Sequence, residues 1–381
     1  MKFLHTSDLH IGKSVHEFSM LADQRHILDQ IREIAGQEQV GAVVIAGDVY
    51  DRAIPSAEAV ELLDDFLTGI LADRIPVIMI SGNHDCGQRV AFADRILEKQ
   101  GLHIAGDYEG ELKRVVFEDE FGAVDFVCLP FVKPALAGGR TCSEAVENIL
   151  SAVPVTMDLR TRHVLVTHFF VTGDQGQLPE ISDSETGVHV GGLDKVPASL
   201  FGLFDYVALG HIHKPQRIGQ GNIYYAGSPL KYSFSEARGS KAVNLVTLGE
   251  KGQVRVEKRE LTPLHDMRVI RGTLEELMAA GMELSQKERE DYIQAVLTDE
   301  TELLDPIGML RSVYPNVMQI LLEKNLKEQG QEFQACAALG HKGLEELFGE
   351  FYEMLKGEKM DQRRTQIVGQ AAEEAERQER A

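Results

Sequence analysis

Five short segments of the sequence carry side chains that could bind metal ions. They are Ser7-Asp8-Leu9-His10, Gly47-Asp48-Val49-Tyr50-Asp51, Gly82-Asn83-His84-Asp85, Thr167-His168 and Gly210-His211-Ile212-His213. Carboxylate, imidazole and amide donors without thiolate suit Mn²⁺, Fe²⁺ or Zn²⁺ better than a soft metal. A single Asp-x-His or a single His after a strand carries little information, but five such segments in one chain are not expected by chance.

The spacing within the segments lets neighbouring side chains share an ion. Asp8 and His10 are two residues apart, so both can reach one ion from a bending loop, and His211 and His213 have the same spacing. Asp48 could bridge two ions held ~3.5–4 Å apart by giving one oxygen to each. Such a pair lowers the pKa of a bound water and stabilises both oxygens of an in-line displacement at phosphorus. The pattern therefore predicts phosphoester hydrolysis.

Almost all of these segments follow apolar runs that read as buried strands. The expected strands are Phe3–Thr6, Ala42–Ala46, Pro76–Ile80, Val124–Leu129, His163–Thr167, Tyr206–Leu209 and Ile223–Ala226, and the expected helices between them include Gln24–Ala35, Ala57–Leu71 and Val90–Lys99. Continuous apolar strands separated by helices indicate a sheet covered on both faces, an α/β sandwich. Loops leaving the carboxyl ends of its strands can bring distant residues onto one patch.

The chain changes character near Leu261-Thr262-Pro263. Beyond it we expect a compact α+β unit with strands at Asp266–Gly272 and Tyr292–Thr298 around a helix at Leu274–Ala280. Further on, Leu344–Leu355 has the apolar spacing of an amphipathic helix. This helix could fold back on its own domain, but its position after a polar stretch favours docking to another chain. The Ala/Glu/Arg-rich end, residues 370–381, is expected to fray.

Composition bounds the class of protein. Of 381 residues, 43% are hydrophobic and 26% charged, which excludes wholesale disorder. Acidic residues outnumber basic ones by 60 to 39, and a net charge of −21 disfavours nucleic acid unless bound metals or a basic partner reverse the local field. The four cysteines are scattered without a C-x-x-C pair, so we expect reduced thiols. Without an apolar run of ~18 residues or a signal peptide, we expect a cytoplasmic protein with no membrane partner.

The five segments resemble the signature of the calcineurin-like metallophosphoesterases, over about residues 1–230. More narrowly, His5–Lys13, Gly47–Arg52 and Ala226–Glu236 resemble the SbcD family, the nuclease subunits of bacterial SbcCD exonucleases. The downstream layout of a small cap and terminal helices is also similar to that family. The resemblance implies a β-sandwich flanked by helices over residues 1–265, a cap over 266–330 that binds DNA, and a helical partner-binding region over 331–381.

The resemblance also implies a pair of metal sites, usually filled by manganese. Asp8, His10, Asp48 and His213 would hold one ion, and Asp48, Asn83, His168 and His211 the other. His84 matches the histidine that contacts the scissile phosphate and assists the leaving oxygen. Asp51 stands where archaeal and eukaryotic relatives tend to carry a histidine, so that role is not carried over. Asp51 is expected to support a ligand or to pair with Arg52, and Asp85 to orient a neighbouring group or to cap a helix.

For function, the resemblance implies an ATP-dependent double-strand exonuclease and single-strand or hairpin endonuclease of DNA repair, recombination and replication. The partners would be DNA, a coiled-coil ATPase of the SbcC type gripped by the Leu344–Leu355 helix, and a second copy of the chain within a heterotetramer. The Ala57–Leu71 helix has a stripe of Val60, Leu63, Leu67 and Ile70. That stripe indicates either a deeply buried helix or the seam of a homodimer.

Two other functions fit part of the pattern. A metallophosphoesterase acting on a nucleotide, cyclic nucleotide or phosphoprotein is one, because Gly47–Arg52 resembles protein phosphatases. Those enzymes, however, usually have Gly-Asn-His-Glu where this chain has Gly82-Asn83-His84-Asp85. The other is a non-catalytic scaffold of the same fold, although scaffolds usually lose ligands. Lys13, Arg89 and Lys231 could contact phosphates, but isolated basic residues are more often only solvated.

Overall fold

The computed structural model describes residues 1–153, 157–158, 160–173, 176–185 and 194–324, together with Tyr352, Met360, Arg364, Thr365 and Val368. The expected helix at Leu344–Leu355 therefore lies, apart from Tyr352, outside the described residues. Within the described part of the chain, no helix is both long enough and apolar enough to cross a membrane.

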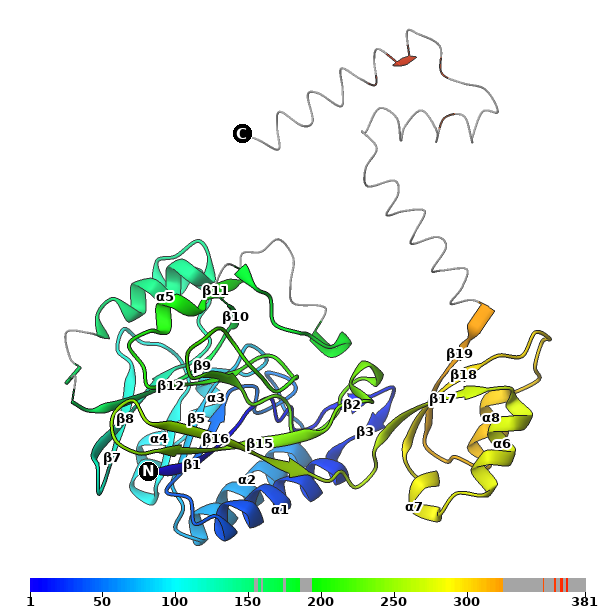
Figure 1. The fold of residues 1–381 in the computed structure, drawn as a ribbon, viewed down its shortest axis with the longest axis horizontal. Helices are drawn as coiled ribbons and strands as arrows, with labels where there is room; N and C mark the ends of the chain where they lie inside the picture. Colours follow the sequence, from blue (N-terminus) through cyan, green and yellow to red (C-terminus); the bar gives the residue numbers. More distant parts are fainter. Residues whose placement is uncertain are drawn as a thin grey trace.

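Two six-stranded sheets pack face to face and form the larger part of the molecule (Figure 1). The first has the order β16 (Val254–Leu261), β15 (Lys241–Leu248), β1 (Lys2–Thr6), β4 (Val43–Ala46), β5 (Val77–Ile80) and β6 (Leu102–Ala105). The second has the order β13 (Gln216–Arg217), β14 (Ile223–Tyr225), β12 (Tyr206–Gly210), β9 (Arg162–His168), β8 (Gly122–Leu129) and β7 (Lys113–Asp119). Apolar side chains of both sheets, among them Phe3, Val44 and Phe126, fill the space between them.

Helices cover the outer faces of the sandwich. α1 (Leu21–Gln37) and α2 (Ala57–Ala72) pack on the first sheet, and α5 (Cys142–Leu150) packs on the second. The central strands are buried on both faces, which explains why their sequences read as continuous apolar runs instead of alternating ones. Shorter elements complete this part of the fold: β2 (Ser14–Val15), β3 (Phe18–Ser19), β10 (Phe170–Thr172) and β11 (Lys195–Pro197).

The α/β class expected from the sequence is confirmed, but the apolar runs alone indicated one covered sheet, whereas the described residues of the sandwich form two six-stranded sheets. The expected start of the second helix is also confirmed, since the Ser56 side chain accepts a hydrogen bond from the Ala59 amide at 3.3 Å. The single helix expected at Val90–Lys99 is wrong. The chain instead forms α3 (Gly87–Val90) and α4 (Asp94–Leu97), because Ala93 between them has a left-handed backbone (φ +61°) that interrupts helical hydrogen bonding.

The apolar stripe on α2 belongs mainly to the core of this chain. Leu63, Leu67 and Ile70 are buried in the cluster beneath the helix, whereas Val60 is 46% exposed. The interpretation as a buried helix therefore holds for most of the stripe, and this stripe offers little surface to a second copy.

A small unit with its own apolar core follows the sandwich (Figure 1). Its parallel sheet has the order β17 (Met267–Gly272), β18 (Tyr292–Leu297) and β19 (Val317–Leu322), with α6 (Leu274–Met282), α7 (Gln286–Arg289) and α8 (Pro306–Arg311). Parallel neighbours need a crossover connection, and α6 and α8 lie in those crossovers. The two strands and the helix expected here from the sequence are present within one or two residues at each end.

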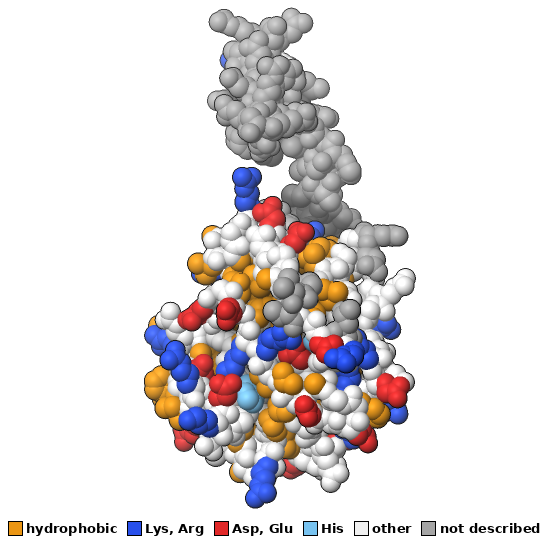
Figure 2. Space-filling view, turned by 90° about the vertical axis from the view of Figure 1, so that its left-hand side faces the viewer, with side chains coloured by type: hydrophobic (Ala, Val, Ile, Leu, Met, Phe, Trp, Pro, Cys, Tyr) orange, Lys and Arg blue, Asp and Glu red, His pale blue; other side chains and the backbone are white. Residues whose placement is uncertain are grey.

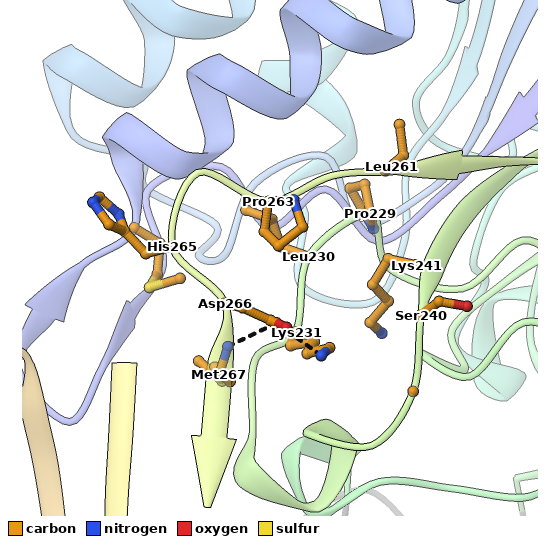
Figure 3. A pocket seen from close by; sticks show the side chains of 12 residues that line it. Pro229, Leu230, Lys231, Ser240, Lys241, Leu261, Pro263, His265, Asp266 and Met267 are labelled. Atoms are coloured by element: carbon orange, nitrogen blue, oxygen red, sulfur yellow. Dashed lines mark hydrogen bonds and ion pairs between the residues drawn. The ribbon is translucent and has the colours of Figure 1, made fainter. Parts of the chain in front are cut away.

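Buried polar contacts hold this small unit against the sandwich. Asp23 of α1 is fully buried and accepts hydrogen bonds from the Tyr292 hydroxyl at 2.7 Å and from the His265 amide at 3.0 Å. Lys231 pairs with Asp266 at 2.8 Å, beside a cavity of about 150 Å³ between the two parts (Figure 3). The Asp23 carboxylate and the Lys231–Asp266 ion pair therefore hold the first residues of β17 and β18 against the sandwich.

Replacing Asp23 with Ala should loosen this junction. The Tyr292 hydroxyl and the His265 amide would lose their buried acceptor, at a cost of about 1–3 kcal/mol in the free energy of unfolding. Urea denaturation measures the loss, and limited proteolysis should show faster cleavage near residues 262–266. The surface variant Asp65→Ala should change neither; an equal effect of both variants would contradict the assignment.

Candidate metal centre

The five ligand-bearing segments meet where the carboxyl ends of both sheets come together. β1, β4 and β5 run parallel in the first sheet, and β9 and β12 run parallel in the second. Each of the five segments begins at, or within two residues of, the carboxyl end of one of these strands. The structure therefore brings all eight expected site residues into one cluster: Asp8, His10, Asp48, Asn83, His84, His168, His211 and His213.

One half of the cluster is formed by Asp8, His10 and His213, whose donor atoms lie within 4.8 Å of one another. All three side chains are buried. The Nε2 atoms of His10 and His213 face each other at 3.1 Å. Two buried imidazole nitrogens directed at one point are an arrangement that a shared cation satisfies.

The other half is built from His168, His211 and Asn83. The Asn83 Oδ1 atom lies 3.1 Å from His168 Nε2 and 2.8 Å from His211 Nδ1. His168 Nδ1 donates to the carbonyl of Ala46 across the two sheets at 2.7 Å, which leaves Nε2 with its lone pair for a metal. This is the tautomer that a histidine ligand requires.

Asp48 lies between the two halves. Its Oδ2 atom is 3.6 Å from His10 Nε2 and 3.2 Å from His168 Nε2. Its Oδ1 atom accepts the backbone N–H of His84 at 2.9 Å. The geometry suits a carboxylate shared by two ions, although Asp8 also lies within 4.8 Å of both Asp48 and His168.

His84 lies at the opening of the cluster. It and Asn83 are partly exposed, whereas the other six residues are buried. His84 Nδ1 donates to the Asp51 carbonyl at 3.1 Å, so Nε2 is the ring atom left for a substrate. A substrate must therefore approach from the side of Asn83 and His84.

Glycines at two of the segments allow the close approach of the chain. A Cβ atom on Gly82 would lie 2.1 Å from Asp48 Oδ1, and one on Gly210 would lie 2.0 Å from the Ala46 carbonyl oxygen. Neither separation is tolerable for real atoms. These glycines are needed because backbone or carboxylate occupies the space of a side chain.

Four of the eight residues have a left-handed backbone. The φ angles are +53° at Asp8, +44° at His10, +47° at Asp48 and +100° at His211. Such conformations are costly for residues other than glycine and collect at functional sites, where the surrounding structure enforces them. The fold thus holds the donors in place before any ion binds.

Burial and mutual charge shift the pKa values within the cluster. Burial raises the pKa of Asp8 to about 6, although His168 opposes this shift. Burial lowers the pKa of His10 to about 3 and that of His213 well below its usual range. For His168, burial is outweighed by Asp48, which raises the pKa of His168 to about 9. For Asp48, burial is likewise outweighed by its imidazole neighbours, chiefly His168, and its pKa lies well below the usual range.

Sequence reasoning missed the residues that orient His213. The Ser184 hydroxyl lies 2.8 Å from His213 Nδ1, and the Glu185 carboxylate accepts the His213 amide. Both are in the loop after β10, where no motif marks them. Gln24 of α1 was also missed: it donates to the His10 carbonyl at 2.7 Å and accepts from the Gly12 amide at 3.0 Å.

Several residues next to the proposed ligands have contacts that bear on the roles expected for them. The Asp85 carboxylate accepts hydrogen bonds from the backbone N–H groups of Val49, Tyr50 and Gly82 at 2.9–3.0 Å. Asp85 therefore orients the loop after Asp48, which is the first of the two roles expected for it. Asp51 Oδ1 binds Lys13 at 2.7 Å and lies 3.6 Å from His10 Nδ1.

The other carboxylate oxygen of Asp51 lies 3.7 Å from Arg52 Nε, so Asp51 binds Lys13 most closely, and neither of its two expected roles is distinguished by a hydrogen bond. Lys13 and Lys231, considered as phosphate contacts, both form ion pairs with carboxylates within the chain.

The donor set fits two divalent ions. Buried carboxylate oxygens, imidazole nitrogens and one amide oxygen converge without a thiolate. The ring nitrogens that face the centre of the cluster contact other members of it: His10 Nε2 faces His213 Nε2, and Asn83 Oδ1 lies beside His168 Nε2 and His211 Nδ1. The residues present are therefore compatible with a dinuclear site.

Two family models match the chain. The calcineurin-like phosphoesterase model matches residues 1–215, more than half of the chain, and the model of the type 5 capsule protein repressor C-terminal domain matches residues 263–355. Together with two packed sheets and a donor cluster at their shared edge, the first match defines a calcineurin-like metallophosphoesterase.

Curated relatives narrow this class. The chain is 32% identical over 328 residues to the D subunit of the nuclease SbcCD of Staphylococcus epidermidis, covering 84% of this chain and 85% of that one. It is 31% identical over 377 residues to the protein of the same name from Staphylococcus saprophyticus, covering 94% of each. A dimetal phosphatase from Danio rerio is a more distant structural likeness, with 14% identity, a TM-score of 0.42, and coverage of 68% of this chain and 96% of that one. The chain belongs to the SbcD family of nuclease subunits.

Metal uptake should depend on pH. Asp8 must be deprotonated to bind an ion, so the apparent affinity for Mn²⁺ should fall as the pH drops below about 6. His168 must also lose its proton, so the affinity should continue to rise toward pH 9. Calorimetric titration in buffers of different ionisation enthalpy measures the protons released. Asp8→Asn should abolish the step near pH 6 and the control Asp65→Asn should keep it; an unchanged step in Asp8→Asn would refute the assignment.

Replacing Gly82 with Ala should displace Asp48. The added methyl group cannot occupy the space of the carboxylate, so we expect loss of at least one bound ion per chain. Metal analysis after gel filtration measures the stoichiometry. Gly36→Ala in α1 is a matched control, since a Cβ there meets nothing within 4 Å and Ala favours a helix. Full metal content in Gly82→Ala would show that the close approach is not required.

Proposed function

We propose that the chain is the nuclease subunit of an SbcCD-type complex and hydrolyses phosphodiester bonds in DNA. The observation that carries the proposal is the convergence of the seven expected metal ligands and His84 at the shared edge of the two sheets. The two staphylococcal relatives, each named as a part of the nuclease SbcCD, support a nucleic-acid substrate, which we take to be DNA. In the complex, the activity would be an ATP-dependent double-strand exonuclease and a single-strand or hairpin endonuclease serving repair, recombination and replication.

We assign the metal ligands as expected from the sequence. Asp8, His10, Asp48 and His213 would hold one ion, and Asp48, Asn83, His168 and His211 the other. When bound, two ions of this kind, which we propose to be Mn²⁺, supply a water of lowered pKa and neutralise charge at phosphorus. The contacts of Asn83 Oδ1 with both His168 and His211 support the second group.

His84 is the residue that we assign to the leaving oxygen. Its Nδ1 donates to the Asp51 carbonyl, which fixes the ring and turns Nε2 toward the substrate side. As the P–O bond breaks, the doubly protonated ring would give its Nε2 proton to the departing oxygen and keep the Nδ1 hydrogen bond to the Asp51 carbonyl. Asp48 helps to place this ring, because its Oδ1 atom accepts the His84 amide.

The partners follow from the same family. The complex would contain a coiled-coil ATPase of the SbcC type, bound by residues 331–381, and two copies of this chain. Exposed apolar side chains on the sandwich support an interface with another chain: Phe92 is 80% and Ile96 is 70% exposed. Residues 1–265 would form the nuclease domain and 266–330 the DNA-binding cap, and the protein would act at the nucleoid in the cytoplasm.

The overall charge does not exclude this substrate. On the face shown in Figure 2, acidic and basic side chains are interspersed and do not form a patch of one sign. Two divalent ions would add positive charge where the scissile phosphate lies. The ATPase would supply much of the remaining DNA affinity.

The test is a Mn²⁺-dependent nuclease assay on a DNA hairpin, with and without the partner ATPase. His84→Ala should lower the cleavage rate by ~10²–10⁴-fold while metal content is retained, since a general acid contributes about that much. Asp48→Ala should lose both cleavage and metal. His103→Ala on β6 is the control and should cleave normally.

Full activity in either active-site variant would refute the assignment. Turnover of a small phosphodiester without cleavage of the hairpin would favour a nucleotide-directed phosphoesterase. A chain that binds no stoichiometric Mn²⁺ would instead be a scaffold of the same fold.

A further inference from the structure

A basic cavity lies next to the proposed metal centre. It measures about 400 Å³, and its lining includes Lys214, Arg238, Lys241, Lys258 and the serines Ser182 and Ser240. Ser240 and Lys241, at the beginning of β15, also line the smaller cavity beside the cap (Figure 3). Four basic side chains around one hollow stand out in a chain with a net charge of −21.

Two of these cations are available to a ligand. Arg238 and Lys258 are exposed and form no ion pair with any described residue. Lys214 pairs with Glu180, but both side chains are more than half exposed, and such pairs contribute little to stability, so Lys214 can exchange partners. Lys241 is buried and held by Glu236, which is the acidic residue in the lining.

The cavity and the metal centre share a wall. Lys214 directly follows His213, and Lys241 Nζ donates to the His213 carbonyl at 2.9 Å. The Ser184 hydroxyl connects the two sides, since it lies 2.8 Å from His213 Nδ1 and donates to Glu236 Oε1 at 3.1 Å. Whatever occupies the cavity therefore lies beside a ligand of the first ion.

We infer that this cavity binds phosphate groups of the nucleic-acid strand that continues away from the scissile bond. The inference rests on the proposed function, because it takes the cleaved phosphodiester to lie at the metal centre. Phosphates follow one another every ~3.4 Å of axis along a strand, so a strand that is held at the metals and runs past His213 would place its next phosphates at this cavity. Guanidinium, ammonium and hydroxyl groups are the side chains that contact such phosphates. Arg238 and Lys258 are the contacts that position the strand.

The experiment uses the full chain and a short single-stranded oligonucleotide in EDTA, where cleavage cannot occur. Binding is followed by fluorescence anisotropy over a range of KCl concentrations. Each lost contact with single-stranded DNA should reduce the salt slope by ~0.7, so Arg238→Gln with Lys258→Gln should reduce it by ~1.4 and weaken binding roughly ten-fold at 0.15 M salt.

The control is Arg74→Gln with Lys99→Gln, which removes the same charge. These residues precede β5 and β6, at the amino ends of the strands and hence at the opposite edge of the first sheet. The control should keep the wild-type salt slope.

If both double variants lose the same oligonucleotide affinity, only the net charge of the chain affects binding, and the inference is overturned. An unchanged salt slope in Arg238→Gln with Lys258→Gln would overturn it as well. Hydrolysis of bis-p-nitrophenyl phosphate by the wild type with Mn²⁺ tests the proposed function independently. If the wild type does not hydrolyse this phosphodiester, the proposed function fails, and the anisotropy experiment still shows whether the cavity binds the oligonucleotide.

Discussion

The approach of the two sheets at their carboxyl ends is the constraint on which the rest of the structure depends. His168 of the second sheet donates to the Ala46 carbonyl of the first, and Gly210 lies so close to the same carbonyl that a side chain would clash with it. His5 makes a similar connection, with its Nε2 atom 3.2 Å from the Leu209 carbonyl. Loops from both sheets start at this shared edge. Proposed ligands separated by up to 205 positions in the chain, from Asp8 to His213, can therefore surround one small space.

The shared edge of the two sheets also explains how the cluster can contain so many buried polar and charged side chains. Asp8, Asp48 and several imidazoles are withdrawn from water, which is costly unless each group is paired. Backbone amides and carbonyls satisfy part of this need: the His211 amide donates to Asp8 at 2.9 Å and the His84 amide to Asp48. The remaining donor atoms face one another, and cations would complete them. Left-handed backbone at four of these residues is a further cost that the surrounding packing must offset.

The first turn of α1 connects this centre to the small C-terminal unit. Asp23 accepts from Tyr292 and His265, while the adjacent Gln24 holds the His10 loop through the Gly12 amide and the His10 carbonyl. Tyr232 joins the same network, since its hydroxyl accepts from the Gln24 amide group at 3.1 Å. The position of the small unit and the position of one proposed metal ligand are thus fixed by neighbouring residues of one helix.

The sequence by itself determined the central strands, because Val43–Ala46 and Val77–Ile80 are buried on both faces and so read as unbroken apolar runs, but it did not reveal β6, β7, β15 or β16. It also predicted the chemistry of the site, because five segments with Asp, His and Asn after such strands are not expected by chance, and resemblance supplied the sandwich and the ligand groups. It could not show that Ala93 turns the chain between two short helices, since a single backbone reversal leaves the apolar spacing intact. Nor could it show Ser184, Gln24 or the cavity around Arg238 and Lys258. Those depend on which loops become neighbours when the two sheets pack, and only the tertiary structure decides that.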